Sequence, residues 1–184
     1  MNRRLCVFCG SRTGSEPAFG EATKVIIEAF ADDGWDFVYG GAGVGLMNLV
    51  AETGLAKGRH VTGILPEVLF DYEVRHEGIS EMIEVADMHV RKRLMTDLSD
   101  AFLVLPGGLG TMDEFFENLT WRQLGIHGKP CALFDVDGYY QPLLQFLDRT
   151  VELGFVDRKQ IDRVFVSNKV DDVVTEIGRR VPPR

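Results

Sequence analysis

The sequence predicts a single α/β domain over residues 1–184, built on a doubly wound, Rossmann-like and mainly parallel sheet with helices on both faces. Short apolar runs alternate with longer segments of helical periodicity, which is the pattern of a βαβ series. The strongly apolar run at residues 101–105 is typical of a parallel strand buried on both faces. No internal repeat or Pro-rich linker marks a second domain, and 184 residues suffice for one hydrophobic core.

The first half of the chain predicts strands and helices in alternation. Apolar residues recur at helical spacing over residues 18–33, and Gly34 follows where a C-terminal glycine is expected. A second helix of small residues follows a glycine-rich stretch, spans residues 46–56 and is closed by Gly58. Strands are expected at residues 5–8, 36–39 and 60–65, and a loop at residues 66–80.

The second half continues the alternation. Strands are predicted at residues 82–85, 101–105, 131–134 and 164–166. Helices are predicted at residues 88–98, 111–124, 141–153 and 170–180. Sheets of this kind bind ligands at the carboxyl ends of their strands, so the turns that follow strands are the first candidates for function.

The charge balance limits the partners of the chain. It has 28 acidic and 20 basic side chains, a formal net charge of −8, which repels nucleic-acid backbones. The first residues are basic but turn polar after Cys9, without the apolar core of a secretory signal or a membrane span. We therefore expect a cytoplasmic protein with no nucleic-acid or membrane partner.

The three cysteines, Cys6, Cys9 and Cys131, form an odd set that suits a reducing compartment. Cys6 and Cys9 have the CxxC spacing of redox motifs, but they fall in an apolar run that predicts a strand, where residues three apart point to opposite faces. A redox pair usually opens a helix, so we favour buried thiols. The four histidines have no metal-ligand spacing, and we expect no metal.

Two glycine-rich turns each follow a predicted strand and precede a predicted helix; they occupy residues 40–45 and 107–111. Without Cβ atoms the backbone can approach an anion closely, and the first amides of the helix donate to it, which predicts a phosphate ligand. The alternative is that the glycines only allow tight turns. Neither turn has Walker or dinucleotide spacing, which favours a mononucleotide over ATP or a nicotinamide cofactor.

Glu114 lies three residues after Thr111 and is the candidate acid. Cleavage of an N-glycosidic bond builds positive charge on the sugar, and a nearby carboxylate can stabilise that charge and orient water. The alternative is a capping box, because Thr-x-x-Glu is also the pattern in which two side chains satisfy amides at the start of a helix. Asp113 and Glu117 are neighbouring candidates.

A basic run, Arg91 to Arg93, lies on the helix predicted at residues 88–98. An arginine at the edge of a cleft can bind phosphate through two parallel hydrogen bonds or donate to a leaving base, which lysine does less well. We therefore select Arg91. The alternative is a solvated helical face on which Asp87 and Arg91 form an i,i+4 ion pair.

At these residues the chain resembles the Lonely Guy family of cytokinin riboside 5′-monophosphate phosphoribohydrolases, often mislabelled as lysine decarboxylases. Residues 106–114 match the distinctive motif PGGxGTxxE, residues 88–92 resemble the second motif of the family, and residues 38–41 and 45–47 resemble its first glycine loop. The resemblance implies hydrolysis of the N-glycosidic bond of cytokinin or other nucleoside 5′-monophosphates, which releases the base and ribose 5-phosphate. It assigns the catalytic roles to Arg91 and Glu114. Substrate contacts are expected at Gly41, Gly43, Met47, Glu73, Lys92, Pro106, Gly107, Gly108, Leu109, Gly110, Thr111, Met112, Asp113 and Glu117.

The resemblance also implies a homodimer, because members of the family typically pair, with a nucleotide as the small-molecule partner and no cofactor. Leu109 replaces a frequent tyrosine, which leaves the preferred base, adenine or a prenylated adenine, open. A pyridoxal decarboxylase needs a Schiff-base lysine and a partner for the pyridinium nitrogen, and no lysine here has that context. The alternatives are a non-catalytic nucleotide or molybdenum-cofactor carrier on the same scaffold, and a hydride-transfer enzyme, which the absent dinucleotide fingerprint disfavours.

Overall fold

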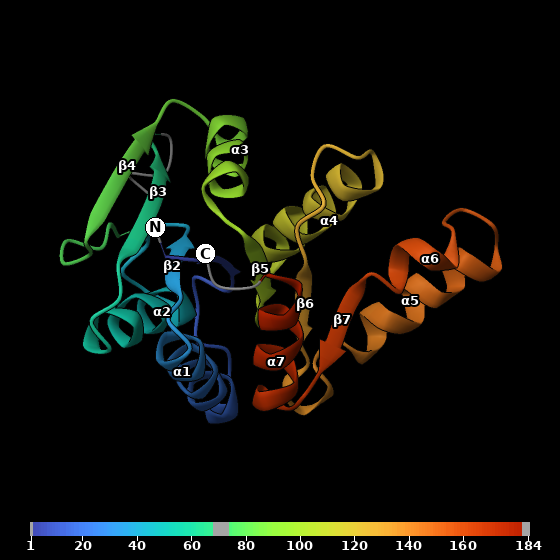
Figure 1. Cartoon of the computed structure of the whole chain (residues 1–184), viewed down its shortest axis with the longest axis horizontal. Helices are drawn as coiled ribbons and strands as arrows, with labels where there is room; N and C mark the ends of the chain where they lie inside the picture. The colour runs from blue at the N-terminus through green and yellow to red at the C-terminus, as the bar shows by residue number, and fades with distance from the viewer. Residues whose placement is uncertain (1, 68–73, 182–184) are drawn as a thin grey trace.

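A computed structural model describes residues 2–67 and 74–181 (Figure 1). Its centre is a seven-stranded sheet in the order β4-β3-β2-β1-β5-β6-β7, in which every neighbouring pair is parallel. The predicted doubly wound parallel sheet is confirmed. The strands are β1 (Arg4–Phe8), β2 (Asp36–Tyr39), β3 (Val61–Pro66), β4 (Glu81–Val85), β5 (Ala101–Val104), β6 (Cys131–Phe134) and β7 (Val164–Ser167).

Helices cover both faces of the sheet, as predicted (Figure 1). The helices α1, α2 and α7 contribute apolar side chains to one core cluster, while α3, α4 and α5 pack against the other. Within the described residues, no helix is both long and apolar enough to cross a membrane. The helical segments are α1 (Pro17–Asp32), α2 (Gly45–Ala56), α3 (Met88–Leu98), α4 (Leu109–Gln123), the 3-10 turn η2 (Val136–Gly138), α5 (Gln141–Glu152), α6 (Arg158–Ile161) and α7 (Val170–Arg180).

The strand order places a topological switch beside β1. The chain runs outward from β1 through β2 and β3 to the edge strand β4, and then returns to pair β5 with the other side of β1. The turns that follow β1 and β5 therefore lead away in opposite directions, which opens a crevice between them. This is where a doubly wound sheet binds its ligand.

The two cysteines of the CxxC pattern lie on opposite faces of the sheet. Cys9 belongs to the core cluster under α1 and α2, whereas Cys6 belongs to the cluster under α3 and α4. Both are free and buried, as is Cys131. The prediction of buried thiols is confirmed, and the alternation of side chains along a strand explains why the two do not meet.

Three local features differ from the prediction. Helix α4 begins at Leu109, two residues early, because Gly108 serves as its N-cap. The predicted loop at residues 66–80 is partly paired, since Arg75 forms an antiparallel bridge with Ala42. The short helix α6 was not predicted, because four residues are too few to show a helical period.

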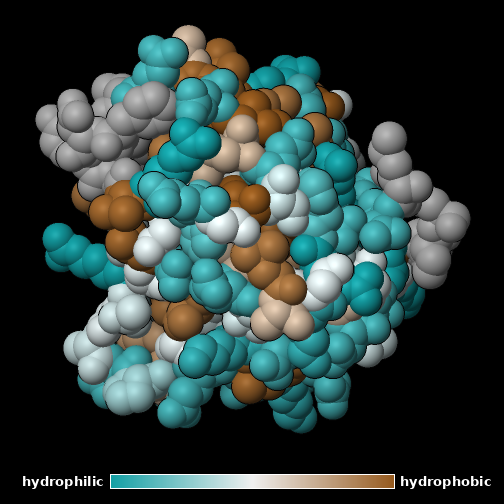
Figure 2. Space-filling model, turned by 90° about the vertical axis from the view of Figure 1, so that its left-hand side faces the viewer, coloured by the Kyte–Doolittle hydropathy of each residue, from teal (hydrophilic) through white to brown (hydrophobic). Residues whose placement is uncertain are grey.

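The edge strand β4 carries charge on its outer positions. Glu81 and Glu84 are exposed and lie beside His60 and Arg75, respectively. Figure 2 views this side of the molecule and shows hydrophilic residues interspersed with hydrophobic ones. Charged residues on an edge strand disfavour pairing with a strand of another chain.

Candidate active site

A cavity of about 540 Å³ opens at the switch point beside β1. Its walls come from the turns after β1, β2 and β5, with side chains from α3 and α4. The charged side chains in its lining are Arg12, Arg91 and Glu114, so the lining carries more positive than negative charge in an acidic chain. The structure brings nine of the expected site residues to this lining: Met47, Arg91, Pro106, Gly107, Gly108, Leu109, Gly110, Thr111 and Glu114.

The start of α4 lines the cavity, and its first backbone amides have no hydrogen-bond partner within the helix. Gly108 is the N-cap, with no side-chain hydrogen bond at the cap, and the amide of Met112 donates to the Gly108 carbonyl at 3.1 Å. The amides of Leu109, Gly110 and Thr111 precede this first intrahelical bond. They and the helix dipole favour an anion at this point. The capping-box interpretation of Thr111 and Glu114 is wrong, because Thr111 lies inside the first turn and not at the N-cap.

The glycines of this turn differ in what they permit. A Cβ atom on Gly107 would overlap the side chain of Thr111, so the packing of the protein itself requires glycine there. A Cβ atom on Gly108 or Gly110 would meet nothing within 4 Å, and neither has a positive φ. Their exposed backbone leaves room for a ligand to approach the amides closely.

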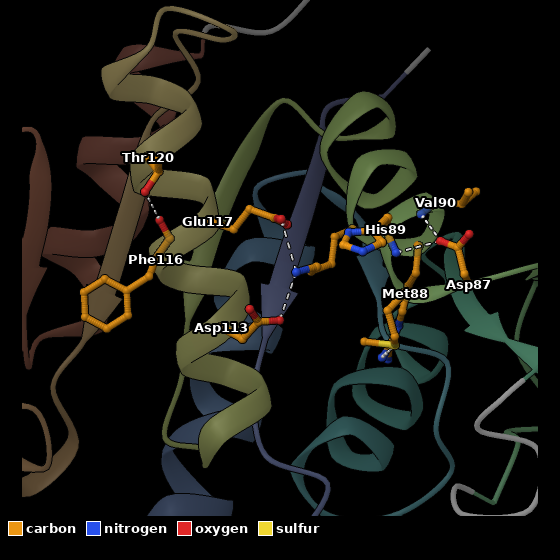
Figure 3. A network of polar contacts seen from close by, with 10 residues as sticks. Asp87, Met88, His89, Val90, Asp113, Phe116, Glu117 and Thr120 are labelled. Atoms are coloured by element: carbon orange, nitrogen blue, oxygen red, sulfur yellow. Dashed lines mark hydrogen bonds and ion pairs between the residues drawn. The ribbon is translucent and has the colours of Figure 1, made fainter.

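Arg91 is held rigidly at the cavity wall and is only 4% exposed. Its Nε donates to the carbonyl of Ile64 at 3.0 Å and its Nη2 to the carbonyl of Gly40 at 2.7 Å. A Cβ atom at position 40 would overlap the guanidinium, so a larger residue there would displace Arg91 from this position. The helix is oriented by Asp87, whose carboxylate accepts the amides of His89 and Val90 at 2.8 Å (Figure 3). The solvated-face interpretation of Arg91 is therefore wrong.

Glu114 is half-buried on the second turn of α4 and lines the same cavity as Arg91. Its negative charge affects the pKa of the Cys9 thiol, which also lines the cavity. Burial raises the pKa of Cys9 well above its ordinary value, and the negative charge of Glu114 raises it further. Cys9 therefore stays a neutral thiol near neutral pH and is no nucleophile. Glu114 contributes a carboxylate to the lining.

The first glycine-rich turn serves the protein's own backbone. The amides of Leu46 and Met47 at the start of α2 both donate to the carbonyl of Gly10, at 3.1 and 3.3 Å. Gly41 and Gly43 are outside the lining and pair with the segment after residue 73: the Gly43 amide donates to Val74, and the Gly41 carbonyl accepts from His76. Tight packing therefore accounts for much of the glycine content of this turn.

Three expected contacts form an ion-pair cluster outside the cavity lining. The ammonium of Lys92 on α3 lies 3.0 Å from Asp113 and 3.1 Å from Glu117, both on α4 (Figure 3). Burial alone would lower the pKa of Lys92, but the hydrogen bonds and charges of the two carboxylates outweigh it and raise that pKa. The cluster joins the helix that carries Arg91 to the helix that carries Glu114.

Two further contacts were expected from the sequence, Met112 and Glu73. Met112 is partly buried and packs against the core cluster beneath α3 and α4. Glu73 lies outside the residues that the structure describes.

The sequence reasoning missed the turn after β1, residues 10–14, and two aromatic residues. Phe19 and Tyr139 line the cavity in an edge-to-face pair with ring centroids 5.5 Å apart, and the Tyr139 hydroxyl donates to the Gly107 carbonyl at 2.6 Å. A signal for the turn was present, because Gly10 and Gly14 flank polar residues directly after the first strand. Tyr139 follows a 3-10 turn that shows no sequence period.

The fold and the site together define a parallel α/β protein with a cavity lined by the start of α4, a fixed arginine and a carboxylate. Residues 47–177 match the family described as possible lysine decarboxylase. The chain belongs to this family, and its curated relatives place it in the Lonely Guy branch.

The sequence relatives are similar over most of the chain. Cytokinin riboside 5′-monophosphate phosphoribohydrolase LOG7 of Arabidopsis thaliana is 48% identical over 84% of this chain and 71% of its own length. Cytokinin riboside 5′-monophosphate phosphoribohydrolase LOG3, also of Arabidopsis thaliana, is 42% identical over 98% of this chain and 84% of its own length. The probable phosphoribohydrolase LOGL3 of Oryza sativa subsp. japonica is 47% identical over 98% of this chain and 85% of its own.

Solved structures are similar at the level of the fold. The molybdenum cofactor binding protein of Rippkaea orientalis matches with a TM-score of 0.74 and 18% identity, covering 98% of both chains. The Moco carrier protein of Chlamydomonas reinhardtii matches with a TM-score of 0.70 and 16% identity, covering 97% of both.

Proposed function

We propose that this protein hydrolyses the N-glycosidic bond of nucleoside 5′-monophosphates, cytokinin nucleotides among them, and releases the free base and ribose 5-phosphate. The observation that carries the proposal is one cavity that combines the start of α4 with Arg91 and Glu114. Sequence relatives with that named activity, at 41–48% identity, support it.

The phosphate of the substrate binds the amides of residues 109–111. These donors are fixed by the helix, so they need no reorganisation when the anion arrives. The exposed glycines Gly108 and Gly110 let the phosphate oxygens approach the backbone. This anchor places the ribose against the second turn of α4, where Glu114 lies.

Glu114 acts on the reacting carbon. As the bond between C1′ and the base nitrogen breaks, positive charge develops on the sugar, and the carboxylate stabilises it. The carboxylate also accepts a proton from the water that adds to C1′, while the base leaves with the bonding electron pair and takes up a proton. Arg91, whose guanidinium is fixed on two backbone carbonyls, donates to the phosphate or to the leaving base.

We further infer a cytoplasmic homodimer that prefers adenine or an N6-prenylated adenine as the base. The mixed apolar wall of Phe19, Tyr139 and Leu109 supports an adenine-like ring, because aromatic and aliphatic side chains pack well against a flat base.

Product analysis tests the function directly. Purified protein is incubated with AMP, N6-isopentenyl-AMP and the corresponding nucleosides, and the products are identified by mass spectrometry. The monophosphates should yield free base and ribose 5-phosphate, and the nucleosides should react poorly because they lack the anchoring phosphate. Retention of the nucleotide without base release would instead select a carrier function.

Substitution of the acid tests the mechanism. Glu114→Gln keeps the shape of the side chain and should lower kcat by about 100-fold or more, with little change in nucleotide affinity. Glu152→Gln is the matched control, because Glu152 is exposed on α5 and outside the cavity lining. Unchanged turnover in Glu114→Gln would show that the acid is assigned wrongly.

A further inference from the structure

The turn after β1, residues 10–14, forms a wall of the cavity that the sequence motifs do not include. Its charged member is Arg12. The side chain of Arg12 is exposed, and within residues 2–67 and 74–181 its guanidinium makes no hydrogen bond or ion pair. The other arginine of the lining, Arg91, has its Nε and Nη2 occupied by backbone carbonyls.

The backbone beneath Arg12 is fixed from two sides. The Gly10 carbonyl accepts the amides of Leu46 and Met47 from α2, while the Gly10 amide donates to the Pro106 carbonyl at 3.0 Å. The turn is therefore tied both to the first glycine-rich stretch and to the start of the phosphate turn. These bonds hold the backbone of Arg12 beside the anion site and leave its side chain unpaired.

Gly45 permits this arrangement. Its φ is +62°, and a Cβ atom on it would lie 2.5 Å from the Ser11 carbonyl oxygen and would overlap the Arg12 amide. Any side chain at position 45 would push the Ser11 and Arg12 peptide away from α2. The first glycine-rich stretch thus acts as a support for the cationic turn.

We propose that Arg12 is a specificity-determining residue of the phosphate subsite, which selects 5′-phosphorylated over unphosphorylated sugars. The inference rests on the proposed function for the identity of the substrate. Among the arginines of the lining, Arg91 already donates to backbone carbonyls. Arg12 supplies a second cation for a phosphate dianion that is bound to the α4 amides. Its planar guanidinium pairs with two phosphate oxygens at once.

Binding of the phosphorylated sugar tests this without requiring turnover. Isothermal titration with ribose 5-phosphate compares the wild type with Arg12→Ala, Arg12→Lys and the control Arg149→Ala, which removes an exposed arginine of α5. Arg12→Ala should weaken binding roughly 10-fold or more, Arg12→Lys by less, and Arg149→Ala should match the wild type. Because Arg12 is exposed and unpaired, the thermal midpoints of all four proteins should agree.

Kinetics separates this inference from the proposed function. With AMP, Arg12→Ala should raise KM at nearly constant kcat, and its slow reaction with adenosine should be unchanged. If the wild type binds ribose 5-phosphate through Arg12 but releases no base, the hydrolase proposal fails and the role of Arg12 stands. If base is released and Arg12→Ala binds ribose 5-phosphate as tightly as the wild type, the role of Arg12 is overturned.

Discussion

The requirement for glycine at position 45 makes a quantitative prediction about stability. Gly45 and Gly58 lie at the two ends of α2 and have similar positive φ values, +62° and +68°. They differ in their surroundings: a Cβ atom on Gly45 would collide with the backbone of Ser11 and Arg12, whereas one on Gly58 would meet nothing within 4 Å. The substitutions Gly45→Ala and Gly58→Ala therefore separate the cost of the collision from the cost of the conformation.

The expected magnitudes follow from these two terms. A left-handed conformation costs a residue with a Cβ atom about 1–2 kcal/mol, and this applies to both variants. Alanine also restricts the unfolded chain equally in both variants, so that effect cancels in the comparison. At Gly45 the collision involves backbone, which must shift, and overpacking of this kind costs about 1–3 kcal/mol more. Gly45→Ala should therefore lose about 2–5 kcal/mol in total.

Urea unfolding measures the difference. The free energies of unfolding of the wild type and both variants are compared by circular dichroism at equal m-values. Gly45→Ala should also bind ribose 5-phosphate more weakly, because the displaced turn carries Arg12, while Gly58→Ala should bind normally. Equal destabilisation of the two variants would refute the argument that contact with residues 11 and 12 demands glycine.

Two further predictions concern the ion-pair cluster and a partly buried histidine. Lys92→Met should lower the free energy of unfolding by about 1–2 kcal/mol, because Asp113 and Glu117 would then repel each other with only partial access to water. The substitution should also reduce kcat, because it loosens the packing of α3 against α4. Lys92→Arg keeps the positive charge and should restore part of the stability and part of kcat. Burial lowers the pKa of His127 below its ordinary 6.5, so its folded state resists protonation and its stabilisation is lost as the pH falls through that value. The loss of unfolding free energy between about pH 7.5 and about pH 5.5 should be smaller in His127→Gln than in the wild type, and exposed His89→Gln should behave as the wild type. An equal acid loss in His127→Gln would count against this pKa shift.

The sheet was predictable because its signals are local. Residues 101–105 are apolar without interruption, and β5 is buried on both faces. The helices at residues 88–98 and 170–180 have strong periodicity, and α3 and α7 begin and end where predicted. The phosphate turn was also visible, because glycines between a strand and a helix are a local pattern.

The exact start of α4 was harder to predict from the sequence. Thr-x-x-Glu satisfies the pattern of a capping box, yet the N-cap is Gly108. Sequence alone does not distinguish a threonine at the cap from one in the first turn, because both place the glutamate on the helix. The choice between Thr111 and Gly108 as the N-cap decides whether the amides of residues 109–111 belong to the helix start.

The ion-pair cluster shows a different limit. Lys92 and Asp113 lie in two segments that resemble family motifs, and Glu117 follows the second of them, so the resemblance implied a substrate role for all three. The structure pairs them with one another across α3 and α4. Lys92 lies more than 20 residues before Asp113 and Glu117 in the sequence, and only the packing of α3 against α4 brings it to them.

The amino-acid order by itself determined the alternation of strands and helices, the two glycine-rich turns and the candidate pair Arg91 and Glu114, because each depends on neighbours within a few residues. Tertiary structure alone decided which groups share the cavity. The strand order sets β1 beside β5, and this places Arg12 and Glu114 in one lining although about a hundred residues separate them. The tertiary structure also determines that the amides of Leu46 and Met47 donate to the Gly10 carbonyl, because this contact joins residues that are distant in the chain.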